Sequence, residues 1–148
     1  MSIQKQDLLR EKCAAAFSAQ SVSRTDMPFL EIFDFDARPA ARKMATERAT
    51  AALCEAFAVE PETVSLYFFA IAPEAYGHAG KYGDAADTKR IFVKLHAYSR
   101  SRALRAAAAA KVTEALAAAY GTTAKAVVIY FFERDPSEVS HAGQLADA

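Results

Sequence analysis

The sequence has little cysteine. Cys13 and Cys54 are the only cysteines in the chain, and they are too few and too far apart for a disulfide framework or a four-ligand zinc site. No pair of histidines has the spacing of metal ligands either. We therefore expect no metal site, a reducing environment and a cytoplasmic protein.

Net charge and long apolar runs are also missing. Eighteen basic residues balance eighteen acidic ones, so no long-range field gathers phosphate backbones or an anionic membrane. The longest apolar stretches fall well short of the roughly 20 residues that a membrane span needs, and the opening segment is too polar to begin a signal peptide. We expect neither a nucleic-acid nor a membrane partner. With 53% hydrophobic residues, the chain fits a compact domain.

The chain contains an internal repeat. The segment VSLYFF, which begins at Val64, returns as VVIYFF, which begins at Val127. The same shift in numbering places the His-Ala-Gly that begins at His78 on the His-Ala-Gly that begins at His141. Such self-similarity indicates a duplication, with one copy at about residues 28–85 and the other at about residues 91–148.

Each copy has the pattern of a strand, a helix and a strand. Alternating polar and apolar residues predict a half-buried strand over 29–35, Pro39 suits the first turn of a helix that ends before Pro61, and a second strand follows at 63–70. The second copy predicts strands at 91–98 and 126–133 and a helix at 102–120 that ends at Gly121.

A strand, a crossover helix and a second strand imply parallel pairing within each copy. Two such units, joined by the polar linker at residues 81–89, predict an α+β fold: one four-stranded mixed sheet with two helices on one face. The other face and the two edges would be bare, which favours oligomerisation. We take residues 27–148 as this domain and residues 1–26, with an apolar stripe at Leu9, Cys13 and Phe17, as a helical extension.

The order of these motifs resembles the tautomerase superfamily. Met27 and Pro28 open the first strand, Arg38 follows at the start of the helix, and the copy ends on the Tyr-Gly-His-Ala-Gly of residues 76–80, as in 4-oxalocrotonate tautomerase. The Ser-Arg-Ser-Arg of residues 99–102 is similar to the arginine segment of malonate semialdehyde decarboxylase and cis-3-chloroacrylic acid dehalogenase. The ending at residues 127–143 is similar to that of macrophage migration inhibitory factor.

The resemblance implies a homotrimer and a reaction without metal or organic cofactor. It implies proton transfer on a small 2-keto or 2-hydroxy-alkenoic acid by an amino-terminal proline, here Pro28. The resemblance makes Arg100, Arg102 and Arg38 the candidates for binding the substrate carboxylate. The serine at position 65 stands where 4-oxalocrotonate tautomerase carries a further arginine. The sequence therefore does not predict the activity of 4-oxalocrotonate tautomerase itself.

Pro28 meets this expectation only if it becomes the first residue. Within a chain its nitrogen belongs to a tertiary amide, which has no proton to exchange and a delocalised lone pair. Translation from Met27, or processing, would free it. Otherwise the protein is a non-catalytic trimeric scaffold, or another base has replaced the proline. Auxiliary candidates for that role are His78 and Tyr130, although both recur in the two copies at His141 and Tyr67, which favours a role in the shared fold.

Overall fold

A computed structural model describes residue 7 and residues 26–35 and 38–148. The predicted helical extension therefore lies almost entirely outside the described residues. The larger strands are β1 (Phe29–Asp34), β2 (Ser65–Ala70), β5 (Ile91–Tyr98) and β6 (Val127–Arg134), and the helices are α2 (Pro39–Phe57) and α3 (Arg102–Tyr120). One short hairpin follows the second strand of each copy. It is formed by β3 (Gly77–His78) and β4 (Lys81–Tyr82) in the first copy, and by β7 (Ser140–His141) and β8 (Gln144–Leu145) in the second.

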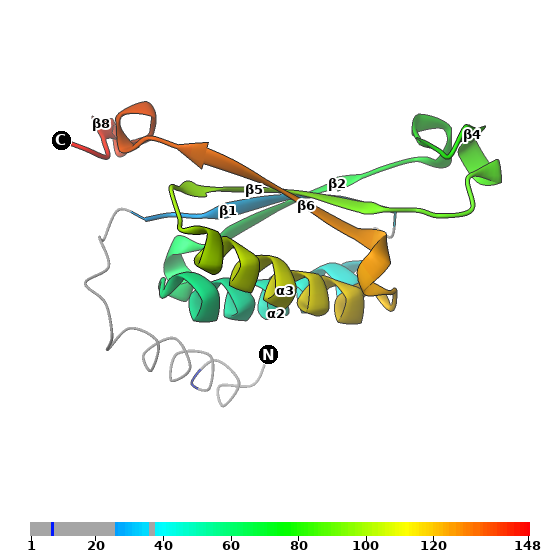
Figure 1. The fold of residues 1–148 in the computed structure, drawn as a ribbon, viewed down its shortest axis with the longest axis horizontal. Helices are drawn as coiled ribbons and strands as arrows, with labels where there is room; N and C mark the ends of the chain where they lie inside the picture. Colours follow the sequence, from blue (N-terminus) through cyan, green and yellow to red (C-terminus); the bar gives the residue numbers. More distant parts are fainter. Residues whose placement is uncertain (1–6, 8–25, 36–37) are drawn as a thin grey trace.

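The four long strands form one mixed sheet in the order β2-β1-β5-β6. β1 pairs parallel with β2, and β5 pairs parallel with β6. β1 and β5 run antiparallel, with Phe29 opposite His96 and Phe33 opposite Phe92. Both helices lie side by side on one face of this sheet, and the two hairpins extend from its opposite ends (Figure 1). The predicted fold class and the parallel pairing within each copy are confirmed.

The repeat is visible in the structure, since α2 and α3 begin and end at equivalent positions of the two copies. Three strands differ from the prediction in their boundaries. β1 ends at Asp34 rather than at residue 35, and β6 covers 127–134 rather than 126–133. β2 begins at Ser65 rather than at Thr63 because residues 61–63 form a 3-10 turn, in which the Thr63 amide donates to the Glu60 carbonyl at 3.0 Å.

The core lies between the sheet and the helices. Alternate residues of the central strands point into it, among them Leu30, Ile32, Val93 and Leu95, which are fully buried. The facing helix surfaces are rich in alanine, which lets the helices approach one another and the sheet closely. The buried alanines are 41, 45, 49, 52 and 56 on α2 and 108, 115 and 119 on α3.

Asp34 is the one charged residue of β1 on this covered face, and its side chain is fully buried. Arg42 of α2 binds it with two hydrogen bonds, Nε to Oδ2 at 3.0 Å and Nη2 to Oδ1 at 2.9 Å. The Tyr120 hydroxyl, from the end of α3, donates to Oδ2 at 2.7 Å. One carboxylate thus joins the first strand to both helices, and a planar guanidinium suits this two-point contact.

Within residues 26–35 and 38–148, none of the helices combines the length and the apolar character that a membrane crossing requires.

Removing the buried carboxylate of Asp34 should cost far more stability than removing the exposed carboxylate of Glu133. Arg105, which occupies in the second copy the position of Arg42 in the first, pairs instead with Glu133, at 2.5 Å and with both side chains more than a third exposed. We expect Asp34→Asn to lower the free energy of unfolding by about 3 kcal/mol and Glu133→Gln by under about 1 kcal/mol. Urea unfolding followed by circular dichroism measures both. Equal losses would contradict a special role for Asp34.

Candidate functional site

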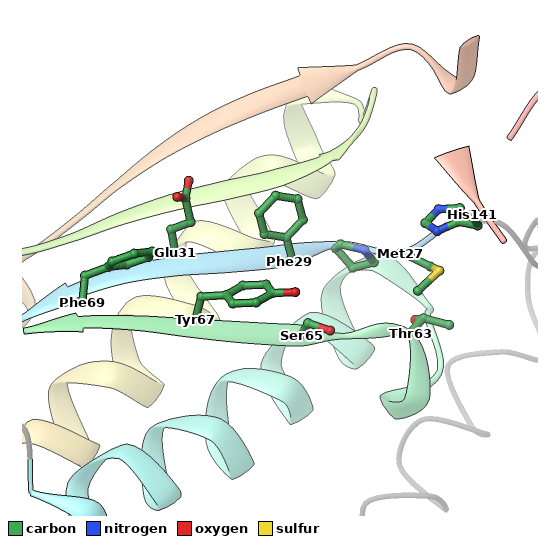
Figure 2. A pocket seen from close by; sticks show the side chains of 9 residues that line it. Met27, Phe29, Glu31, Thr63, Ser65, Tyr67, Phe69 and His141 are labelled. Carbon is green, nitrogen blue, oxygen red and sulfur yellow. The ribbon is translucent and has the colours of Figure 1, made fainter. Parts of the chain in front are cut away.

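Pro28 lies directly before β1 and is fully buried. It lines a cavity of about 500 Å³, which we call the Pro28 cavity. The walls come from β1 and β2 on the face of the sheet that the helices leave bare, and from the β7–β8 hairpin at its end (Figure 2). The lining residues are Met27, Pro28, Phe29, Glu31, Thr63, Ser65, Tyr67, Phe69 and His141.

The position suits a proline for a structural reason as well. The Pro28 carbonyl accepts a hydrogen bond from the Ser65 amide at 3.3 Å, so the residue contributes its acceptor to the start of the sheet. A proline at this position needs no donor. In the intact chain its nitrogen is bonded to the Met27 carbonyl and cannot exchange a proton.

A smaller hollow of about 90 Å³ adjoins the Pro28 cavity, with Met27, Phe29 and His141 in both walls. We call it the Tyr98 hollow. Its other lining residues are His96, Ala97, Tyr98, Arg134 and Val139. Two buried polar atoms of this lining, the Tyr98 hydroxyl and His141 Nε2, have no hydrogen-bond partner among the described residues. Buried polar atoms without a partner are uncommon and call for an explanation.

His96 already has partners. Its Nε2 lies 2.7 Å from the Glu31 carboxylate, and its ring stacks on Phe29 at 4.2 Å between centroids and on Phe132 at 5.0 Å. The edge of the imidazole ring thus contacts a carboxylate, and its two faces pack against phenyl rings. His96 and Glu31 therefore form a paired unit on the bare face of the sheet.

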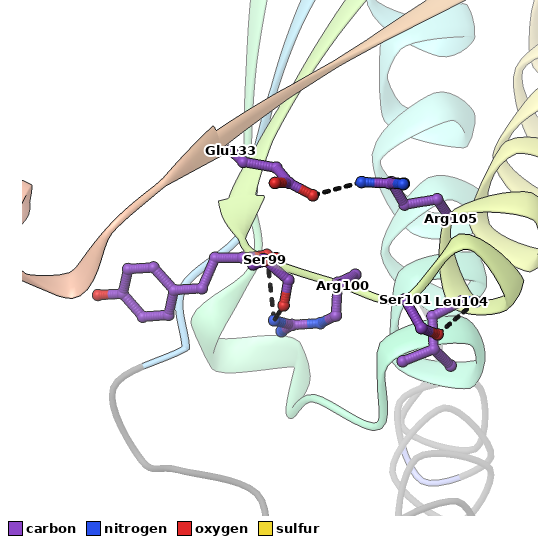
Figure 3. Close-up of polar contacts among 7 residues, drawn as sticks. Ser99, Arg100, Ser101, Leu104, Arg105 and Glu133 are labelled. Atoms are coloured by element: carbon purple, nitrogen blue, oxygen red, sulfur yellow. Dashed lines mark hydrogen bonds and ion pairs between the residues drawn. The ribbon is translucent and has the colours of Figure 1, made fainter.

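Arg100 lies just beyond β5 and is largely buried. Its guanidinium forms an ion pair with Asp26, donates to the carbonyls of Tyr98 and Ser99 at 3.2 Å each, and sits 4.9 Å from the centre of the Phe57 ring. Figure 3 shows the two carbonyl contacts. Burial lowers the pKa of Arg100 from its ordinary value. The arginine predicted to bind a substrate carboxylate thus holds the carboxylate of Asp26, two residues before Pro28.

The other predicted residues lie in different places. Arg102 is exposed in the first turn of α3, after Ser101, whose side chain caps the helix by accepting from the Leu104 amide at 3.2 Å (Figure 3). Arg38 is exposed before α2, beyond the far end of β1 from Pro28.

His78 and Tyr130 do not line the Pro28 cavity. His78 lies in the β3–β4 hairpin at the opposite end of the sheet (Figure 1), with its ring parallel to that of Tyr76 at 6.4 Å. Tyr130 is 58% exposed on β6 and makes an edge contact with Phe92 at 5.1 Å.

Sequence reasoning did not single out Asp26, Tyr98, Arg134 or His141 for this site. For His141 a signal existed. Because β1 and β5 run antiparallel and β6 runs parallel to β5, β6 ends at the same end of the sheet at which β1 begins. The hairpin of the second copy therefore lies at the end of the sheet that carries Pro28. The repeat is visible in the sequence, but that antiparallel junction is not.

No family model and no curated protein sequence matches the chain. Solved structures do. Native fused 4-OT aligns at 18% identity over 80% of this chain and 96% of that one, with a TM-score of 0.75. Macrophage migration inhibitory factor of Toxoplasma gondii aligns at 16% identity over 79% and 98%, with a TM-score of 0.65. N1, a member of the cis-3-chloroacrylic acid dehalogenase family, aligns at 15% over 79% and 82%, also with a TM-score of 0.65.

These likenesses show the fold of the tautomerase superfamily, as the resemblance in the sequence predicts. All three alignments span about four fifths of the chain, so the match covers the doubled strand-helix-strand unit.

Tyr98 generates a test of stability against pH. Burial raises the pKa of its hydroxyl, so above about pH 10 the unfolded chain releases this proton and the folded chain keeps it. Stability from this group is fully present below that pH and is lost as pH rises. We expect Tyr98→Phe to leave stability at pH 7 unchanged or higher, since the hydroxyl has no described partner, and to lose less stability than the native chain at alkaline pH.

Tyr76→Phe is the matched control. The Tyr76 hydroxyl donates to the Thr88 carbonyl at 2.7 Å and accepts from the Arg90 amide at 3.0 Å, so its loss should cost about 1–2 kcal/mol at pH 7. Urea midpoints at several pH values measure both variants. If Tyr98→Phe loses as much stability at pH 7 as Tyr76→Phe, the Tyr98 hydroxyl is not a buried group without a hydrogen-bond partner.

Proposed function

We propose that the protein carries out cofactor-free proton transfer of the keto-enol tautomerase type on a small 2-keto or 2-hydroxy-alkenoic acid, with the Pro28 amine as the base once Pro28 becomes the amino terminus. The observation that supports the proposal most directly is the burial of Pro28 in the wall of an aromatic cavity at the start of β1. The tautomerase fold adds to it, because its solved examples include fused 4-OT.

The chemistry follows from the nature of the group. A free proline nitrogen is a secondary amine with an available lone pair, and an apolar pocket favours its neutral form, which accepts a proton. Phe29, Tyr67 and Phe69 supply apolar surface around this position. Such an amine can remove a proton beside a carbonyl and return it elsewhere on the same molecule, so no redox or electrophilic cofactor is consumed.

Release of Pro28 would change Arg100 at the same time. A chain that begins at Pro28 lacks Asp26, so the buried guanidinium loses the carboxylate that it holds in the intact chain. A buried charge without a partner is costly, and the carboxylate of a substrate can replace the lost one. One cleavage would therefore create the base and release Arg100 from Asp26. Arg100 packs against Phe57 and lines neither the Pro28 cavity nor the Tyr98 hollow in the intact chain. Arg102 is the second cation of this segment.

The decisive comparison is between the intact chain and a chain translated from Met27, whose loss of Met is confirmed by intact mass. Ketonisation of an arylpyruvate enol, followed by ultraviolet absorbance, should be at least about 100-fold faster than buffer with the chain that begins at Pro28, because general-base catalysis supplies about 10²–10⁴-fold. In that chain Arg100→Gln should raise KM about tenfold or more. If neither chain exceeds the buffer rate, the proposal fails.

Assembly into a homotrimer belongs to the same proposal. The bare face of the sheet carries Phe29, Phe33, Tyr67, Phe69, Phe92, Tyr130 and Phe132. Phe33 stacks on Phe69 at 4.9 Å and on Phe92 at 5.7 Å, while Tyr67 and Tyr130 are more than half exposed. An aromatic surface of this kind is typical of an interface, and the solved fused 4-OT structures include symmetric and asymmetric trimers.

A charge in this face should therefore break the assembly. We expect Tyr130→Glu to shift the mass measured by light scattering after size exclusion from three chains toward one, because it buries an unpaired carboxylate at the interface. Thr122→Glu, on the exposed turn after α3, is the control and should keep the native mass. A native chain that is monomeric at micromolar concentration would contradict the trimer.

A non-catalytic scaffold is the second candidate function. It is favoured by the acylated nitrogen of Pro28 together with the Asp26–Arg100 ion pair, which leaves neither family group available in the intact chain. This candidate predicts a trimer without turnover in either form of the chain.

A further inference from the structure

The structure places His141 in the wall of the Pro28 cavity. It comes from β7 and lines both the Pro28 cavity and the Tyr98 hollow. Figure 2 places its ring beside Met27, at the end of the cavity where β1 begins. Its Nε2 atom is buried and has no hydrogen-bond partner among the described residues. An unpaired buried nitrogen costs free energy, so its place in the cavity wall needs a reason.

Comparison with the other copy shows that this arrangement is not required by the fold. His78, the equivalent residue, lies against the parallel ring of Tyr76. The counterpart of Tyr76 in the second copy is Val139, so His141 lacks this aromatic neighbour. Both hairpins use the same turn, with positive φ at Ala79 and Gly80 and again at Ala142 and Gly143. The backbone is repeated, whereas the surroundings of the imidazole differ.

The other groups in the two walls are less suited to accept a proton. The Pro28 nitrogen is an amide in the intact chain. Glu31 is engaged by His96 at 2.7 Å, and burial raises the pKa of Tyr98, which keeps its phenol protonated. Arg134 is a cation whose Nη1 donates to the Glu133 carbonyl at 3.2 Å. His141 is the imidazole of this lining whose buried Nε2 has no hydrogen-bond partner among the described residues, and a histidine side chain can act as a general acid or base.

We propose that His141 is the catalytic acid-base residue of the intact chain, in which it performs the proton transfer that Pro28 cannot. This inference rests on the proposed function for the type of reaction and the class of substrate. With its own proton on Nδ1, the ring presents a lone pair at Nε2. Nε2 takes the hydroxyl proton of a 2-hydroxy-alkenoic acid while the O–H electron pair forms the carbonyl. The carbon-carbon double bond then takes the proton from the imidazolium at C3, which yields the 2-keto acid and neutral His141.

Arg134 supplies the charge that the carboxylate of such a substrate needs. It lines the Tyr98 hollow with His141. Its hydrogen bond to the Glu133 carbonyl uses one nitrogen of the guanidinium, and the Glu133 carboxylate pairs with Arg105 rather than with Arg134. Among the residues that line the Pro28 cavity and the Tyr98 hollow, Arg134 is the one arginine or lysine, so it is the cation of this wall that can meet a carboxylate. The substrate carboxylate would thus lie in the Tyr98 hollow and its reacting carbon in the Pro28 cavity.

The test uses the intact chain, with mass spectrometry before and after the assay to exclude cleavage. The expected result is ketonisation of an arylpyruvate enol above the buffer rate, a loss of about 100-fold or more in kcat with His141→Gln, and partial recovery by imidazole added to His141→Ala. Gln144→Ala, directly across the hairpin from His141, controls for damage to the turn and should keep the native kcat. Arg134→Gln should raise KM about tenfold with kcat within about threefold.

A second measurement requires no catalytic variant. In the native chain labelled with ¹⁵N-histidine, oxalate, a planar dicarboxylate that resembles the enolate of a 2-keto acid, should shift the His141 Nε2 signal and leave the His78 signal unchanged. An unchanged His141 signal at saturating oxalate would overturn the proposal, and so would a His141→Gln chain that keeps kcat within about threefold of the native value, because a general acid-base group contributes about 100-fold or more.

The two proposals can fail separately. An inactive intact chain beside an active chain that begins at Pro28 overturns the role of His141 and leaves the proposed function standing. Activity of the intact chain that depends on His141, with none gained when Pro28 is freed, supports His141 and removes the proline mechanism. Absence of activity in both overturns both.

Discussion

The arrangement of the first strand and the two helices depends on the hydrogen bonds of one buried carboxylate, that of Asp34. It lies on the covered face of β1, and it is bound by Arg42 from α2 and by Tyr120 from α3. The packing around it is made largely of alanine and short aliphatic side chains, which hold elements together without specifying their relative positions. A charge-assisted contact that joins one strand to two helices has directional requirements that alanine lacks, so it helps to set the position of both helices against the first strand. Pro28 lies directly before that strand.

The fold was largely predictable because its signals are periodic and repeated. The alternation in residues 29–34, the spacing of buried alanines on both helices and the constant shift between the two copies all agree with the observed elements. The boundaries that differed are local effects, such as the 3-10 turn that Pro61 begins. The order of the strands and the antiparallel pairing of β1 with β5 were not predicted, because no sequence pattern specifies which strands of the two copies pair.

The site was much less predictable, because it depends on which ends of the sheet meet. Pro28 and Arg100 became candidates through the resemblance of the sequence to the tautomerase superfamily. That Asp26 holds Arg100 follows from no pattern, since the two residues are far apart in the chain and meet only because β5 ends where β1 begins. His141 was noted as a repeated residue and interpreted through the symmetry of the repeat. Its surroundings depend instead on a difference between the copies, Val139 against Tyr76, whose meaning appears only when the hairpin is placed beside the cavity.

The doubled chain has made its two extremities unequal. Near the start of β5, Tyr76 ties the preceding segment down through Thr88 and Arg90 and packs edge-on against Phe35. Near the start of β1, the corresponding position is a valine, and open volume takes the place of a ring. Duplication usually gives a protein two equivalent copies of each structural feature. The end that carries Tyr76 is held by hydrogen bonds and ring contacts, whereas the end that carries Val139 has open volume, so substitutions at the second end disturb fewer contacts of the fold.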